Sequence, residues 1–210
     1  MVSKARTLKV IAVTQTKLTL EGVRLMKKLG LAVILLLGFA GMAVAQDVPA
    51  AEVFGGYSFF RCDAGDDISC NLNGWNAAVD FNASDSWSVV ADFSGHYGYL
   101  DGPVTTGSGT YPWYDVKSHN FMFGPRYKMR TEKVTPFLHA LFGINHINPE
   151  AGDTVQNNFA MAFGGGVDVK VSDKMSVRAI QLDYVTTRVG ADWNDNMRFS
   201  AGVVFNLGSR

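Results

Sequence analysis

The sequence predicts an all-β protein: an eight-stranded antiparallel up-and-down transmembrane β-barrel. Three observations favour this fold class. Eight segments of about ten residues alternate apolar and polar side chains with a period of two, as strands do when their two faces meet different surroundings. Short polar connectors alternate strictly with long ones along the chain. No segment carries a convincing apolar stripe with helical spacing.

Residues 1–45 are expected to be a leader that is removed before the barrel folds. The basic pair Lys27-Lys28 precedes an apolar stretch that ends in the Ala-Val-Ala of residues 43–45, the pattern of a signal peptide and its cleavage site. A membrane-spanning anchor is the alternative. The uncharged run at 29–45 has 17 residues, which is short for a spanning helix.

The mature chain, residues 46–210, is expected to be one acidic domain, with Met26 as the true start of translation. Seven basic residues and Glu21 are removed with the leader, which leaves 12 basic and 18 acidic residues, a net charge of −6. A nucleic-acid-binding protein would need the opposite sign. We therefore expect no nucleic-acid partner.

The chain has two cysteines, Cys62 and Cys70, both beyond the leader. Export implies an oxidising compartment, so we expect a disulfide that closes a short loop. Two free thiols or a metal pair are the alternatives. No histidine lies near the two cysteines in the sequence to complete a metal site.

The first four strands are expected at 51–60, 74–84, 87–97 and 117–129. AEVFGGYSFF opens the set. In GWNAAVDFNAS, every odd-numbered position is apolar, and the even-numbered ones include Asn, Asp and Ser. WSVVADFSGHY sets Trp, Val, Phe and Tyr against Ser, Asp and His, and KSHNFMFGPRYKM sets Phe and Tyr against Asn, Arg and Lys. These last three segments therefore each present one apolar and one polar face.

The last four strands are expected at 134–146, 157–171, 175–187 and 196–207. VTPFLHALFGINH opposes Pro, Leu, Phe and Ile to Thr, His and Asn. In NNFAMAFGGGVDVKV one face is bulky and apolar; the other is small and then charged, and its glycines ease curvature or let interior groups pack. MSVRAIQLDYVTT loses its phase near residues 179–180, which predicts a β-bulge that keeps Arg178, Gln181 and Asp183 on the charged face. NMRFSAGVVFNL closes the set.

The connectors predict the orientation of the barrel. Short ones lie at 84–86, 130–133 and 172–174, and long ones at 61–73, 98–116, 147–156 and 188–195. Short periplasmic turns and longer outer loops produce this order in an outer-membrane barrel. Acidic residues of the long loops are candidates to attract divalent cations or a basic partner of unknown identity: Asp63, Asp66, Asp67, Asp101, Asp115, Glu150, Asp153, Asp192 and Asp195.

The polar face is expected to fill the lumen. If the apolar face meets lipid, no backbone group can stay unpaired and the sheet must close. An eight-stranded barrel is only wide enough to hold its own side chains, so charges of both signs should pair across it and plug it. The candidates are Asp80, Asp92, Arg126, Lys128, Asp168, Lys170, Arg178, Asp183 and Arg198.

No constellation of catalytic or metal-ligating residues emerges, and we expect no metal and no cofactor. His96, His119 and His146 are expected at the surface or in the interfacial girdle, and His139 as a hydrogen-bonded interior residue. Ser118, His119 and Asp115 could be assembled into a hydrolase-like site. However, neighbouring strand residues face opposite ways, so Ser118 and His119 do not cooperate simply.

The last two strands also carry a resemblance. VRAIQLDYV and NMRFSAGVVFNLG resemble the closing strands of small outer membrane β-barrel domains, in the broad family of the outer membrane protein A barrel. The motif of Ser200, Gly202, Phe205 and Leu207 resembles the C-terminal signal that the barrel assembly machinery reads, although Gly208-Ser209-Arg210 follows it where such chains commonly end on an aromatic residue. The resemblance implies an outer-membrane location and a structural or surface-interaction role. It transfers no functional residues.

These observations lead to one expected function and two alternatives. The leading hypothesis is a non-enzymatic, monomeric barrel, held by outer-membrane lipids, that supports the envelope or presents its loops. A narrow porin for small solutes is the first alternative. The second is a secreted lipocalin-like binder whose apolar face points inward.

Overall fold

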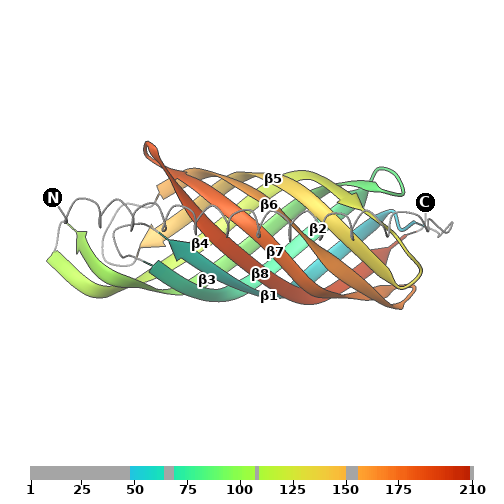
Figure 1. The fold of residues 1–210 in the computed structure, drawn as a ribbon, viewed down its shortest axis with the longest axis horizontal. Helices are drawn as coiled ribbons and strands as arrows, with labels where there is room; N and C mark the ends of the chain where they lie inside the picture. Colours follow the sequence, from blue (N-terminus) through green and yellow to red (C-terminus); the bar gives the residue numbers. More distant parts are fainter. Residues whose placement is uncertain (1–47, 64–68, 107–108, 150–155, 209–210) are drawn as a thin grey trace, which may run out of the picture. The chain divides into compact units, whose positions relative to one another are not determined.

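The structure, a computed structural model, describes residues 48–63, 69–106, 109–149 and 156–208. Within them the chain forms eight strands and no helix (Figure 1). The strands are β1 (Ala51–Asp63), β2 (Ser69–Asn82), β3 (Trp87–Thr106), β4 (Gly109–Lys128), β5 (Val134–Pro149), β6 (Gln156–Ser172), β7 (Met175–Val189) and β8 (Asp192–Leu207). No helix long and apolar enough to cross a membrane occurs in this part of the chain. The expected signal peptide and the start at Met26 lie outside it.

The eight strands form one closed antiparallel sheet. Each strand pairs with the next along the chain, and β8 pairs with β1, with Val53 opposite Phe205 and Cys62 opposite Asn196. The predicted up-and-down barrel is confirmed. We call the end that carries the connectors after β2, β4 and β6 the turn end, and the opposite end the loop end.

The two faces of the sheet have opposite chemistry. Large apolar side chains on the outer face are exposed, for example Phe123 at 65% and Phe81 at 59% of full exposure. Side chains one position away, such as Met122, Asp80 and Asn82, point inward and are buried. A soluble domain rarely exposes a continuous apolar surface of this kind, whereas a lipid-facing barrel wall requires it.

The strands extend further toward the loop end than the sequence pattern predicted. The segments 61–73, 98–116 and 188–195, expected as loops, are largely strand. In particular, 98–116 was expected to lack strand structure, but β3 and β4 stay paired as far as Thr106 and Gly109. Alternation of apolar and polar residues arises where one face of a strand meets lipid. A strand that extends beyond the membrane has water on both faces, so its sequence does not alternate.

The extensions of β3 and β4 outrun their neighbours. The pairing of β3 with β2 ends at Asp101, and the pairing of β4 with β5 begins at Val116. From there the two strands pair only with each other, across Asp101 and Trp113 and then Val104 and Tyr111. We call residues 102–112 the β3–β4 ribbon; its hairpin projects beyond the other strands in Figure 1.

The predicted bulge in β7 is present. The register of β7 against β8 shifts between Arg178 and Gln181, and the β6 pairing skips Ala179 at the same place. Arg178, Gln181 and Asp183 are all fully buried and inward. The bulge therefore restores the phase of the strand, as the sequence indicated.

Candidate functional site: the ion network of the lumen

Charged and polar side chains from all eight strands meet inside the barrel. We call this set the lumen network: Glu52, Asp80, Asp92, Arg126, Lys128, Arg130, His139, Asp168, Arg178, Gln181, Asp183 and Arg198. Every member is inward-facing, and Arg126, Arg178 and Arg198 have no exposed surface at all. Charges removed from water to this degree must be paired and hydrogen-bonded.

In the half nearer the loop end, Arg198 joins two carboxylates. Its Nη1 donates to Asp92 at 2.7 Å and its Nε to Asp183 at 2.8 Å. The other oxygen of Asp183 accepts from His139 Nε2 at 2.8 Å. Since Arg126 donates to His139 Nδ1, the imidazole is neutral with its proton on Nε2. His139 is thus the hydrogen-bonded interior residue that the sequence predicted.

Toward the turn end the chain of contacts continues from Arg126. Its Nη1 lies 2.6 Å from Asp80, which also pairs with Lys128 at 3.1 Å. Lys128 then contacts Glu52 at 2.7 Å, and Glu52 accepts from Arg130 at 2.6 Å. One continuous series of ion pairs and hydrogen bonds therefore runs from Asp92 to Arg130.

Arg178 forms a branch of this series in the bulged part of β7. It donates from Nε and Nη2 to the two oxygens of Asp168 at 2.8 and 3.0 Å, a bidentate pair. Its Nη1 donates to Gln181, which passes a further hydrogen bond to Asp183. Gln181 thereby connects the branch to the main series.

Two aromatic rings hold the guanidinium groups in place. Arg178 lies over the rings of Phe54 and Phe137, at 4.3 and 4.4 Å from their centroids, and Arg126 lies 4.4 Å from that of Phe137. Contacts of this kind stabilise a desolvated cation. Gly166 leaves room for the stack, since a Cβ there would lie 2.7 Å from the Phe137 ring.

Eight of the nine predicted lumen charges belong to the network, and Lys170 does not. Although Lys170 shares the inward phase of β6, it lies at the turn-end mouth of the lumen, is exposed and pairs with Asp173 at 2.8 Å. The hydrogen bond from Lys170 and its charge lower the pKa of Asp173. Its parity in the strand predicted that Lys170 would join the charges inside the lumen. A position so close to the end of the strand lies in water instead.

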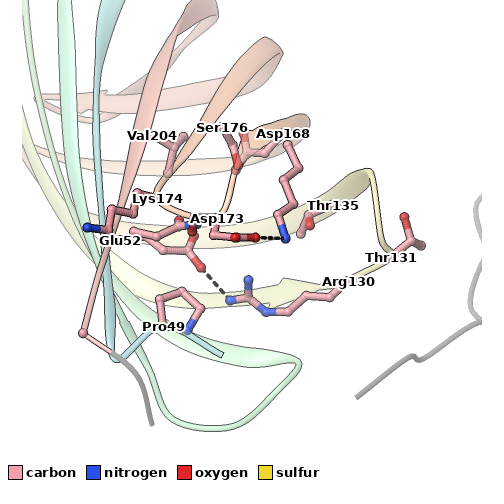
Figure 2. Close-up of a pocket in the computed structure, with 13 residues that line it drawn as sticks. Pro49, Glu52, Arg130, Thr131, Thr135, Asp168, Asp173, Lys174, Ser176 and Val204 are labelled. Carbon is pink, nitrogen blue, oxygen red and sulfur yellow. Dashed lines mark hydrogen bonds and ion pairs between the residues drawn. The ribbon is translucent and has the colours of Figure 1, made fainter. Parts of the chain in front are cut away.

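The network separates two cavities. The cavity at the turn end, shown in Figure 2, has a volume of about 640 Å³ and is bordered by Glu52, Arg130 and Asp168. A second cavity of about 180 Å³ lies at the loop end and shares no lining residue with the first. The network holds five cations, five carboxylates and one neutral imidazole, so it is balanced in charge. Such a layer lets no ion cross without breaking pairs in a low-dielectric interior.

The remaining histidines divide between the two faces. His96 was expected at the surface, but it is fully buried in the lumen, stacked on Phe60 and hydrogen-bonded through Nε2 to Ser58 at 2.9 Å. That expectation was wrong because it relied on the closeness of His96 to the end of the expected strand. The alternation places His96 on the polar face of the strand, which is the face that points into the lumen. His119 and His146 do lie on the outer face, where His119 contacts Tyr97 at 3.1 Å and His146 contacts Asn157 at 2.8 Å.

Neither serine–histidine pair forms a catalytic arrangement. Ser118 points inward and is buried, whereas His119 points outward. Ser58 does contact His96, but the Nδ1 of that ring is buried without a hydrogen-bond partner, so no acidic group orients it. Within the described residues, no group of three or more His, Cys, Asp or Glu could hold a metal ion. Of the acidic loop candidates, Asp66, Asp67, Glu150 and Asp153 lie outside those residues.

The other predicted residues lie on β1, β2 and β8. Cys62 and Cys70 are opposite each other in β1 and β2 and are joined by a disulfide. On β8, Ser200 points into the lumen, whereas Phe205 and Leu207 are outward and about half exposed. Gly202 pairs with Gly56 across the β1–β8 closure.

Sequence reasoning missed four members of the site: Glu52, Arg130, Phe54 and Phe137. Glu52 and Phe54 share the inward phase of β1, where aromatic residues on both faces hide the alternation. Phe137 has the same parity in β5 as His139 and faces inward with it, but an aromatic residue at that position carried no sign that it would contact cations. Arg130 sits in a connector, but its two-residue spacing from Lys128 was an available signal.

The family model for the outer membrane protein beta-barrel domain matches residues 31–206. The chain belongs to this family. Membership of it implies a place in an outer membrane. A search of curated proteins returns no match.

Several solved structures are similar to this chain. Neisserial surface protein A (NspA) aligns with a TM-score of 0.58 at 15% identity, over 75% of this chain and 97% of its own. The attachment invasion locus protein Ail of Yersinia pestis has a TM-score of 0.48 and 16% identity, over 75% and 99%. The N-terminal barrel of Pseudomonas aeruginosa OprF has 0.48 and 12%, over 76% and 98%. At these identities the NspA likeness supports the fold alone.

Proposed function

We propose that this chain is a monomeric, non-enzymatic and non-conducting barrel of the bacterial outer membrane that acts at the cell surface through the β3–β4 ribbon. The extension of the ribbon beyond its neighbouring strands is the main support for this proposal. The ribbon extends past the last pairs with β2 and β5, at Asp101 and Val116, and among the residues that the structure describes no further strand pairs with either of its outer edges. Unpaired strand edges are templates for an extended segment of a partner.

The lumen network supports the non-conducting part of the proposal. Its four fully buried cations, Arg126, Lys128, Arg178 and Arg198, line neither the turn-end cavity nor the loop-end cavity, so they fill the part of the lumen between them. The porin alternative would need an open path at this level. The lipocalin-like alternative would need an apolar lumen, and the charged interior argues against it.

The closed wall supports a monomer in lipid. β8 pairs with β1 along the barrel, so the wall offers no free edge to a second copy. The outward Phe205 and Leu207 at the end of β8 fit recognition by the barrel assembly machinery, followed by release into outer-membrane lipids.

Sidedness is tested by two single cysteines placed in the disulfide-free background Cys62→Ala/Cys70→Ala. Thr105→Cys lies in the ribbon and should react with a membrane-impermeant maleimide on intact cells. Its matched control, Lys174→Cys, lies in the turn after β6 and should react only after permeabilisation. The reverse result would place the ribbon in the periplasm and end the proposal of a surface role.

Conductance and attachment test the role itself. Purified wild-type protein in planar bilayers should give no steady openings. Cells that carry a barrel with the ribbon replaced by an Asn-Gly turn should attach less well to protein-coated surfaces, with unchanged amounts of barrel in the membrane. Steady channel openings, or attachment that does not depend on the ribbon, would count against this function.

A further inference from the structure

The inward-facing wall changes character near the loop end. Phe60, Leu72 and Val116 point into the lumen and are 4%, 1% and 6% exposed. They lie above the lumen network, on the side away from the turn end, and Phe60 packs on His96. A lumen that served only as a water-filled vestibule would carry polar side chains at these positions.

These residues line the cavity of about 180 Å³, which is partly open. Ile147 and Val189 add to its apolar wall, and the Cys62–Cys70 disulfide closes one side. None of its lining residues is charged. The cavity therefore excludes ions, phosphates and other charged ligands, because nothing in it compensates for their lost hydration.

One side of the cavity is polar and closes it toward the network. Asn145 Nδ2 donates to Ser118 and to Asn120, both at 2.8 Å. Asn120 contacts Ser94, which accepts from Arg198 at 3.1 Å. A continuous polar layer thus forms the floor, and the cavity is blind on the side of the network.

We propose that this loop-end pocket binds a small, uncharged, mainly apolar molecule, such as a monocyclic aromatic or short aliphatic alcohol. The size sets the class: an apolar protein cavity of about 150 Å³ holds one benzene molecule. The apolar part of the ligand lies against Leu72, Val116 and Val189. This binding is independent of the ribbon and goes beyond the surface role proposed above.

The probe for the test is benzyl alcohol, which is soluble in water and has one ring and one hydroxyl. The protein is placed in lipid nanodiscs with methyl-labelled Leu and Val, and chemical shifts are followed during titration. The methyl signals of Leu72, Val116 and Val189 should shift together and saturate, with a dissociation constant on the order of 1 mM for a ligand of this size. Val89, which faces lipid, should drift without saturation as the probe partitions into the bilayer.

Filling the pocket should abolish the saturable shifts. Val116→Phe adds bulk inside the cavity, and the matched Val89→Phe adds the same bulk on the lipid face. Val189→Phe does so near the strand end, where the backbone is less constrained, and serves if Val116→Phe fails to fold. Absence of saturable shifts in wild type, or their persistence in the folded filled variants, would overturn the proposal.

Discussion

Arg178 has the densest set of contacts of any side chain in the lumen network. It makes a bidentate pair with Asp168, donates to Gln181 and lies between the rings of Phe54 and Phe137. Because it has no exposed surface, its removal leaves the carboxylate of Asp168 without a cation and opens a void between two rings.

Arg178→Ala should therefore destabilise the barrel strongly. Loss of one member of a fully buried pair costs about 3–5 kcal/mol, and water that enters the lumen would bring the loss toward the lower value. Unfolding in detergent micelles, followed by tryptophan fluorescence and heat-modifiable gel migration, measures the change. Arg188→Ala, an exposed arginine on the same strand, is the control and should unfold like wild type. Equal stability of the two variants would contradict a packed charged interior.

At the same scale, sequence reasoning found charges better than it found their partners. Asp80, Asp92 and Arg198 could be assigned to the lumen because a charge in a lipid-facing strand has only one face to occupy. Phe54 and Phe137 could not be recognised as partners of these charges, since only the three-dimensional position of a guanidinium group brings it over a ring. His96 shows the same limit: a residue near the end of an expected strand was in fact deep in a longer one.

At the scale of the element, the β3–β4 ribbon is held only by its own two strands. Beyond the pair of Asp101 and Trp113 it pairs with no other strand in the described part of the chain. Its extent was invisible to the sequence pattern, because alternation requires different surroundings on the two faces. The turn-end connectors were predicted well, since lipid on one side of the adjoining strands keeps their pattern clear to the end.

Replacement of residues 102–112 by Asn-Gly should leave the stability of the barrel unchanged. Asp101 and Trp113 are directly opposite, so a two-residue type I′ turn fits between them. Thermal unfolding and heat-modifiable migration should match wild type. A marked loss of stability would mean that the ribbon packs on the barrel and is not an independent extension.

At the scale of the whole molecule, closure and lipid exposure were predictable together. Eight alternating segments with an apolar face oblige the sheet to close in a membrane, and the β1–β8 pairing does so. Ala140 provides the test because it lies outward in mid-β5, between the buried His139 and Leu141.

Ala140→Arg should cost about 2–4 kcal/mol of folding free energy if the position is near the bilayer centre. The matched variant Ala191→Arg places the same charge in the exposed turn between β7 and β8 and should cost little. Refolding into lipid vesicles across a denaturant series measures both. If Ala140→Arg folds as readily as Ala191→Arg, the outer face does not meet lipid.

The lumen network also bears on how the chain finds its register. Arg198 bonds to Asp92, which is 106 positions away in sequence, so this contact forms only after β8 has returned to β1. A slip of one residue in that last pairing would turn Arg198 toward the hydrocarbon and Phe199 inward. Asp92 and Asp183 would then be buried without the cation that pairs with them. The interior charges thus select the correct register in the final step of assembly. A barrel that closes in the wrong register is destabilised by unpaired buried charges, which favours its reopening.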